Sequence, residues 1–154
     1  MDTNIDSETG KFSKVNKIDV NPKIWSDDLQ VGDAAIDHQH QEVFLLTQLL
    51  DKAVRDNSLI ENILTFLVTY TNEHFKDEEN LMDRHGFLEI DEHKEAHELF
   101  KVTVFKLKSD YESSPNQAGK LIFPIRKLID EIIDHIIHVD YKLKALRLNE
   151  INPS

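Results

Sequence analysis

Five histidines and two carboxylates in this 154-residue chain have the residue types and spacing of a metal site. They fall one or two to a segment along four stretches with helical spacing, and they are His40, His74, Glu78, His93, His97, His135 and Asp140. His74 and Glu78 are four residues apart, as are His93 and His97, and residues at that spacing on an α-helix point the same way, about 6 Å from each other. Each pair therefore offers two ligands to one position.

These residue types favour a pair of metal ions inside a helix bundle. Cysteine is absent, so nitrogen and oxygen must hold any metal. Seven ligands are too many for a closed tetrahedral zinc site and about right for two six-coordinate ions that share bridging ligands and keep one position open. Because imidazole outnumbers carboxylate, the set should stabilise ferrous iron and favour binding dioxygen reversibly over splitting it.

Four helices are predicted to position these residues, at about 34–55, 59–84, 90–111 and 120–143, because apolar residues recur there at spacings of three and four. Pro124 must either lie in the first turn of the last helix or kink it. Short connections between the helices predict an all-α, up-down-up-down antiparallel four-helix bundle. The predicted core includes Val43, Phe44, Leu46, Phe75, Phe100, Val104 and Ile136.

Two other histidines lie close to candidate ligands. His38 is two residues from His40, about 200° around a helix, so both cannot face inward, and His38 is predicted to be solvated. His85 lies about 16 Å along the helix axis from His74, beyond reach of the same metal pair. We expect His85 to interact with the helix end instead.

Asp140 is the ligand candidate that spacing supports least. It is five residues from His135, about 140° off its face on a regular helix, and His138 is better aligned. Asp140 can reach the metals only if the helix is rotated by packing or loosened locally.

The chain is predicted to comprise a polar N-terminal arm (1–22), one bundle domain (23–145) and a C-terminal tail (146–154), with Trp25 anchoring the segment before the first helix. The formal net charge of −11 argues against nucleic acid and anionic membranes as partners, and favours a basic protein partner or none. No apolar run approaches the roughly 20 residues of a membrane span, and the N-terminus lacks the order of a secretory signal, so a cytoplasmic location is expected.

The order and spacing of several motifs resemble the bacterial hemerythrins, a family of non-haem diiron proteins that bind oxygen. The resemblance covers residues 24 to about 141. Its elements are Trp25 with Leu29-Gln30-Val31-Gly32, Ile36-Asp37-His38-Gln39-His40, His74-Phe75-Lys76-Asp77-Glu78-Glu79 with Leu81-Met82, His93-Lys94-Glu95-Ala96-His97, and His135-Ile136 with Asp140. Members often carry a tryptophan near the middle of the last helix, where this chain has Leu128-Ile129-Asp130-Glu131-Ile132-Ile133, and the N-terminal arm has no counterpart in the motif.

The resemblance implies a role for each candidate. His93, His97 and His135 would hold one iron, His40 and His74 the other, and Glu78 and Asp140 would bridge them together with an oxo or hydroxo group. Dioxygen would bind reversibly at the iron held by two histidines, in a carrier, store or supply protein that is not an enzyme. A redox enzyme or sensor acting on peroxide or nitric oxide is the alternative, and a structural or storage bundle that holds zinc or iron is a third hypothesis.

Overall fold

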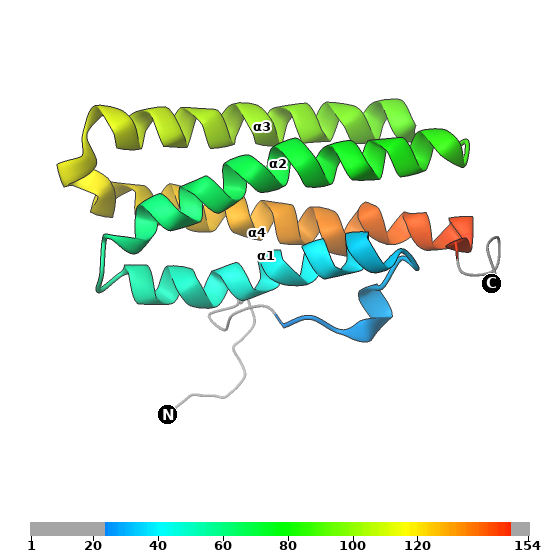
Figure 1. Ribbon diagram of the computed structural model, residues 1–154, viewed down its shortest axis with the longest axis horizontal. Coiled ribbons are helices and arrows are strands. Elements are labelled where there is room, and N and C mark those ends of the chain that lie inside the picture. Colours follow the sequence, from blue (N-terminus) through cyan, green and yellow to red (C-terminus); the bar gives the residue numbers. More distant parts are fainter. Residues whose placement is uncertain (1–23, 149–154) are drawn as a thin grey trace, which may run out of the picture.

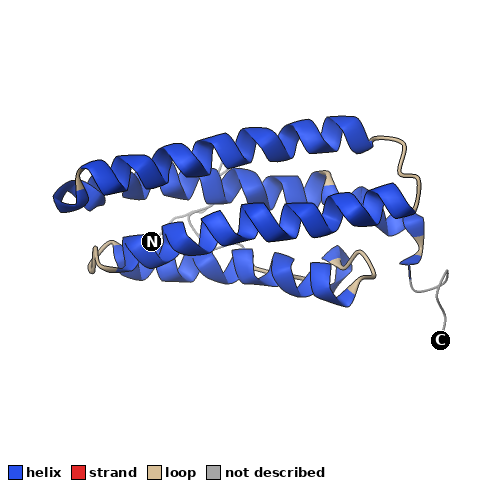
Figure 2. Ribbon diagram, turned by 45° about the horizontal axis from the view of Figure 1, so that its top comes forward, coloured by secondary structure: helices blue, strands red, loops and turns tan. Residues whose placement is uncertain are grey.

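The computed structural model describes residues 24–148, and the predicted arm (1–22) and residues 149–154 of the predicted tail lie outside this range. The described chain forms an all-α bundle, as predicted, of four helices that lie side by side (Figures 1 and 2). The helices are α1 (Ala34–Ala53), α2 (Leu59–Arg84), α3 (Ile90–Ser113) and α4 (Ile122–His138). Three 3₁₀ segments accompany them, η1 (Asp27–Leu29), η2 (Pro115–Leu121) and η3 (Asp140–Leu146).

The chain runs up and down through the bundle, so that helices adjacent in sequence are antiparallel neighbours (Figure 1). α1 packs against α2 and α4, and α3 packs against the same two helices. One end of the bundle therefore carries the connections α1–α2 and α3–α4. The other end carries the α2–α3 connection, the segment that leads into α1, and η3 (Figure 1).

Local sequence explains how α1 begins and how α2 ends. Asp33 caps α1, because its carboxylate accepts a hydrogen bond from the Ile36 amide at 3.0 Å. The chain leaves α2 through Gly86, whose φ of +65° suits a residue without a side chain. Ser58, just before α2, is a residue type that often caps helices, but its hydroxyl donates to Asp56 and makes no capping hydrogen bond.

The last helix is shorter than predicted. α4 spans 122–138 instead of about 120–143, and its flanks adopt the tighter η2 and η3. Short 3₁₀ turns are common at helix ends, where they satisfy backbone groups that the helix leaves unpaired. Pro124 is the third residue of α4 and lies in its first turn, where its missing amide hydrogen costs no hydrogen bond within the helix.

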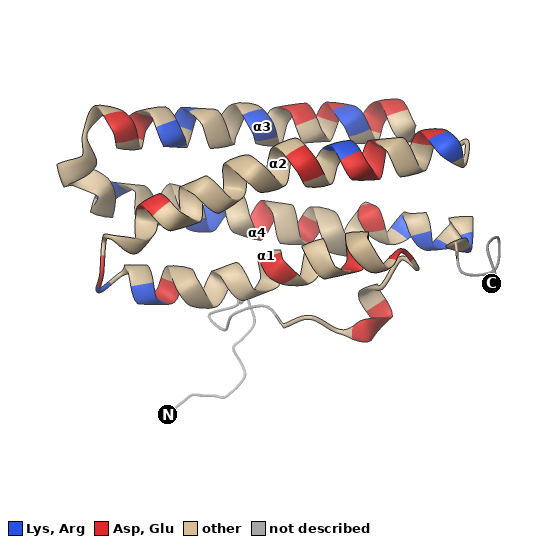
Figure 3. Cartoon of the chain, viewed as in Figure 1, with Lys and Arg blue, Asp and Glu red and all other residues tan. Residues whose placement is uncertain are grey.

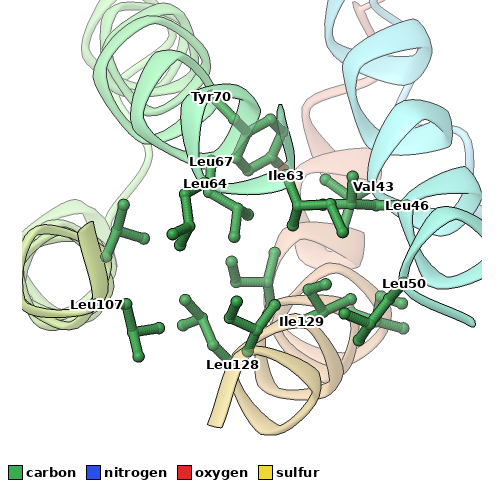
Figure 4. Close-up of a cluster of buried hydrophobic side chains, with 14 of the residues drawn as sticks. Val43, Leu46, Leu50, Ile63, Leu64, Leu67, Tyr70, Leu107, Leu128 and Ile129 are labelled. Carbon is green, nitrogen blue, oxygen red and sulfur yellow. The ribbon is translucent and has the colours of Figure 1, made fainter. Parts of the chain in front are cut away.

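Two apolar clusters fill the interior. The larger occupies the half of the bundle nearer the α1–α2 connection (Figure 4). It contains six of the seven predicted core residues, and the seventh, Phe100, is partly buried and packs against it. The smaller lies at the other end, around Ile36, Leu81, Met82 and Leu143. Val54 continues the helical spacing of the apolar residues of α1, but it follows the end of this helix and is exposed. The candidate metal ligands lie along the helices between these two clusters.

Trp25 anchors the segment before α1, as predicted. Its ring packs edge-on against Phe44 with centroids 5.6 Å apart. Further along the same segment, the buried Asp37 of α1 accepts hydrogen bonds from the amides of Val31 at 2.7 Å and Gly32 at 3.3 Å. This carboxylate fixes the approach of the chain to the helix that carries His40.

Charged side chains are distributed along all four helices, with acidic residues more numerous than basic ones (Figure 3). None of the helices between residues 24 and 148 combines the length and apolar character that crossing a membrane requires.

Replacing Asp37 with alanine should lower the free energy of unfolding by about 2 kcal/mol, because the buried Val31 amide would lose its acceptor. The matched control is Asp51→Ala, which removes an exposed ion pair with Arg126 and should cost about 0.5 kcal/mol or less. Urea unfolding of the metal-free variants measures both values. Equal losses in the two variants would contradict the role given to Asp37.

Candidate metal centre

The structure brings all seven predicted residues together in two overlapping groups. Every helix contributes: His40 comes from α1, His74 and Glu78 from α2, His93 and His97 from α3, and His135 from α4, while Asp140 opens η3. The first group comprises Glu78, His93, His97, His135 and Asp140, and the second comprises His40, His74, Glu78 and Asp140. Within each group, one potential ligand atom from every residue lies within 4.8 Å of the others, and all seven residues are buried.

Glu78 presents one carboxylate oxygen to the histidines of each group. Its Oε1 lies 3.0 Å from the His93 Nε2 and 3.1 Å from the His97 Nε2. Its Oε2 lies 3.3 Å from the His40 Nε2 and 3.5 Å from the His74 Nε2. A carboxylate with this orientation can bridge two metal ions.

Asp140 repeats the arrangement from the opposite side of the bundle. Its Oδ1 lies 2.8 Å from the His93 Nε2 and 2.9 Å from the His135 Nε2, while its Oδ2 lies 3.0 Å from the His40 Nε2. The end of α4 makes this possible, because the helix stops at His138 and the chain turns into η3 at Asp140. This end of the regular helix is the local loosening that Asp140 needs to face the same point as His135. His138, the better-aligned rival, is exposed.

The other rejected histidines also lie away from the two groups. His38 is exposed and lies 3.6 Å from Glu42, at the surface of α1. His85 caps the C-terminal end of α2.

The buried polar atoms of the cluster fit metal ions better than they fit one another. Despite their proximity, five atoms that face the centre find no hydrogen-bond partner among residues 24–148, namely His40 Nε2, His74 Nε2, His97 Nε2, Glu78 Oε2 and Asp140 Oδ1. Buried polar groups are normally hydrogen-bonded, and unpaired ones destabilise a fold. Nitrogen and oxygen atoms that converge on a shared point are what metal coordination needs. The nitrogen and oxygen donors suit iron.

Two hydrogen-bonding contacts on the far side of the imidazole rings orient His74 and His97. The sequence alone did not predict them. The Nδ1 of His74 lies 2.5 Å from the Gln39 Oε1, and the Gln39 Nε2 donates to Asp77 at 3.1 Å. The Nδ1 of His97 lies 2.8 Å from the Glu79 Oε2. A proton on each Nδ1 would leave Nε2 free to bind metal, the usual arrangement for metal-binding histidines. Gln39 and Glu79 adjoin ligand candidates in sequence, but only the packing of the helices reveals their contacts.

Aromatic rings hold several imidazoles in place. Phe75 stacks on His97 with centroids 3.9 Å apart and planes 2° apart, and Tyr70 stacks on His74 at 4.5 Å and 16°. Phe100 meets His135 edge-on at 5.4 Å. These contacts restrict ring rotation and line the cluster with apolar surface on the side of the larger core.

The two carboxylates and the imidazoles also shift one another's acidity. Burial alone would lower the pKa of His40, but the facing carboxylates of Asp140 and Glu78 raise it to about 10. The same balance raises the pKa of His93 to about 9. Burial would raise the pKa values of Glu78 and Asp140, yet the facing imidazoles hold both below their usual range. In the metal-free protein at neutral pH, protons on these histidines therefore compensate the buried carboxylates.

The helical bundle and its buried cluster of histidines and carboxylates define a metal-binding four-helix-bundle protein. Comparison with known families identifies which one, because the Hemerythrin HHE cation binding domain matches residues 31–146. The chain belongs to the hemerythrin family, which binds a non-haem diiron centre, and two iron ions are accordingly its cofactor.

Named relatives agree with this assignment. A bacteriohemerythrin of Pseudomonas paraeruginosa is 32% identical over 100 residues, which cover 64% of this chain and 65% of that protein. A hemerythrin-like protein of Naegleria gruberi is 32% identical over 81% of this chain and 93% of its own length. Myohemerythrin of Riftia pachyptila is 31% identical over 80% of this chain and 92% of its own length. The chain thus spans about two thirds of the bacteriohemerythrin's length.

The raised histidine pKa values predict how the stability of the metal-free protein depends on pH. A group whose pKa rises on folding stabilises the fold below its ordinary pKa, and this contribution is lost as pH rises through the folded value. For His40 and His93 the loss runs from about pH 6.5 to between 9 and 10. The pKa values of Glu78 and Asp140 shift in the opposite direction. Their contribution to stability is lost as pH falls below their ordinary pKa values of 4.5 and 3.8.

The melting temperature of the metal-free protein should therefore be highest between about pH 5 and 6.5 and fall on either side. Calorimetry across this range, after iron has been removed with a chelator, measures the profile. The iron-loaded protein is the control, because bound metal would keep the imidazoles unprotonated and remove the alkaline decline. A melting temperature of the metal-free protein that rises between pH 6.5 and 9 would contradict the prediction.

Proposed function

We propose that this protein binds dioxygen reversibly at its diiron centre, as a carrier, store or supply protein. His93, His97 and His135 would hold one iron, His40 and His74 would hold the other, and Glu78 and Asp140 would be shared between the two. Ferrous iron supplies the electrons and the coordination position that dioxygen binding requires. The protein supplies the orientation of the ligands and a site that excludes water.

The main support for this proposal is that the two groups of candidate ligands contain different numbers of histidines. Both share Glu78 and Asp140, but one adds three histidines and the other only two. An iron ion accepts up to six ligands, so the group with His40 and His74 leaves more room for an external molecule. A small ligand entering there needs no displacement of a protein side chain.

The surroundings favour reversible binding. His40, Glu78 and His97 have no exposed surface, and apolar clusters lie on both sides of the site. An apolar enclosure keeps out water and protons, which promote irreversible oxidation of iron. Five imidazoles against two carboxylates also give less anionic donation than carboxylate-rich centres that activate oxygen. These features support a binding protein over an enzyme.

The absorption spectrum of the reduced, iron-loaded protein tests the function. We expect a visible band to appear in air, to disappear when oxygen is removed under argon, and to return over repeated cycles. Zinc-loaded protein is the control and should show no such change. Direct conversion to a stable oxidised spectrum at the first exposure would refute reversible binding and favour a redox or storage role.

A matched pair of variants tests the proposed ligands. His40→Ala should lower the iron content by about half, because the two-histidine group would keep too few donors to hold its ion. His38→Ala changes the same residue type two positions away at the exposed surface and should retain full iron content. Metal analysis measures the iron content of both proteins, and circular dichroism confirms that they are folded. Full iron content in His40→Ala would contradict the assignment.

A further inference from the structure

The hydroxyl of Tyr70 is buried beside the metal centre without a hydrogen-bond partner. Tyr70 is 5% exposed, and its hydroxyl makes no hydrogen bond with any of the residues that the structure describes. Buried tyrosine hydroxyls usually find a partner, since leaving one unpaired destabilises the fold. The apolar side chains around the ring do not provide one.

Stacking fixes the position of this ring. Tyr70 lies one turn before His74 on α2, and the two rings are nearly parallel with centroids 4.5 Å apart. Phe66, one turn earlier, stacks on the same ring at 5.9 Å. The phenol is thus held in register with an imidazole of the two-histidine group and has little freedom to turn away.

The ring lies on the side of that group that faces the larger core. On α1, Val43 follows His40 by about one turn, and because α1 and α2 are antiparallel, Val43 and Tyr70 lie on the same side of the His40–His74 pair. Figure 4 shows Tyr70 extending from α2 into the interior, with Val43 opposite it on α1. Val43, Phe44 and Phe75 also belong to this cluster and carry no hydrogen-bonding side chain.

We propose that the Tyr70 hydroxyl donates a hydrogen bond to a small ligand with an acceptor atom when that ligand binds at the His40–His74 position. The inference rests on the proposed function and adds a residue that recognises the ligand. A phenol is a protonated donor at neutral pH. One such hydrogen bond, formed only when the ligand is present, would slow its release without changing how the protein holds iron.

Azide binding to the oxidised, iron-loaded protein tests this role independently of oxygen. Tyr70→Phe removes the hydroxyl and keeps the ring, and it should weaken azide binding about tenfold, the contribution of one hydrogen bond in a buried site. Tyr111→Phe is the matched control, because the Tyr111 hydroxyl donates to Glu61 at 3.3 Å on the surface. Its azide affinity should equal that of the unmodified protein. Titration of the azide absorption band measures all three.

A second measurement uses the unmodified protein, in case Tyr70→Phe does not hold iron. A hydrogen bond from an exchangeable hydroxyl should shift the infrared stretching band of bound azide between H₂O and D₂O. Unchanged azide affinity in Tyr70→Phe would overturn the proposal, as would an azide band that does not respond to D₂O. A failure to bind oxygen reversibly, with azide affinity still dependent on Tyr70, would overturn the oxygen-binding function alone.

Discussion

The burial of seven ionisable side chains between two apolar clusters is the constraint on which the structure depends. Imidazoles and carboxylates lose favourable contacts with water when they are buried, and the loss must be offset by charges of opposite sign or by metal. Glu78 and Asp140 offset part of it by facing both histidine groups at once. The surrounding apolar residues then close around a cluster that is electrically balanced.

Because the ligands come from every helix, the cluster also links the bundle. α1, α2, α3 and α4 each place at least one histidine in it, and η3 adds Asp140. A bound metal pair would hold these elements together, and binding energy of this kind contributes directly to folding. Without metal, protonated histidines must serve the same purpose, so the folded state and the charge state of the site depend on each other.

Helical periodicity in the sequence predicted the four helices and placed His40, His74 and His93 on inward faces. α2 has the predicted bounds. Periodicity assumes a regular helix, however, and could not foresee that α4 ends at His138 and turns Asp140 toward the site. The family resemblance, not the spacing, selected Asp140.

The contacts of Gln39, Glu79 and Tyr70 were not predictable for a different reason. The first two depend on a neighbour from another helix, and the third depends on an atom without a hydrogen-bond partner. The spacing of residues in a single sequence shows neither feature. Gln39 reaches His74 across the interface of α1 and α2, and Glu79 reaches His97 across that of α2 and α3. Polar residues beside a ligand motif look like ordinary surface positions until the helices are packed.

The contacts of Gln39 and Glu79 add a second difference between the two proposed iron positions, beside the number of histidines. His97 is paired with the carboxylate of Glu79, whereas His74 is paired with the neutral amide of Gln39. A carboxylate partner makes a metal-bound imidazole a stronger donor, and a neutral amide does so less. The three-histidine position therefore has both more donors and the stronger donor, which favours oxidised iron there. In this proposal the position at His40 and His74 would keep an iron that still needs a ligand, near the Tyr70 ring, whose hydroxyl makes no hydrogen bond among the described residues.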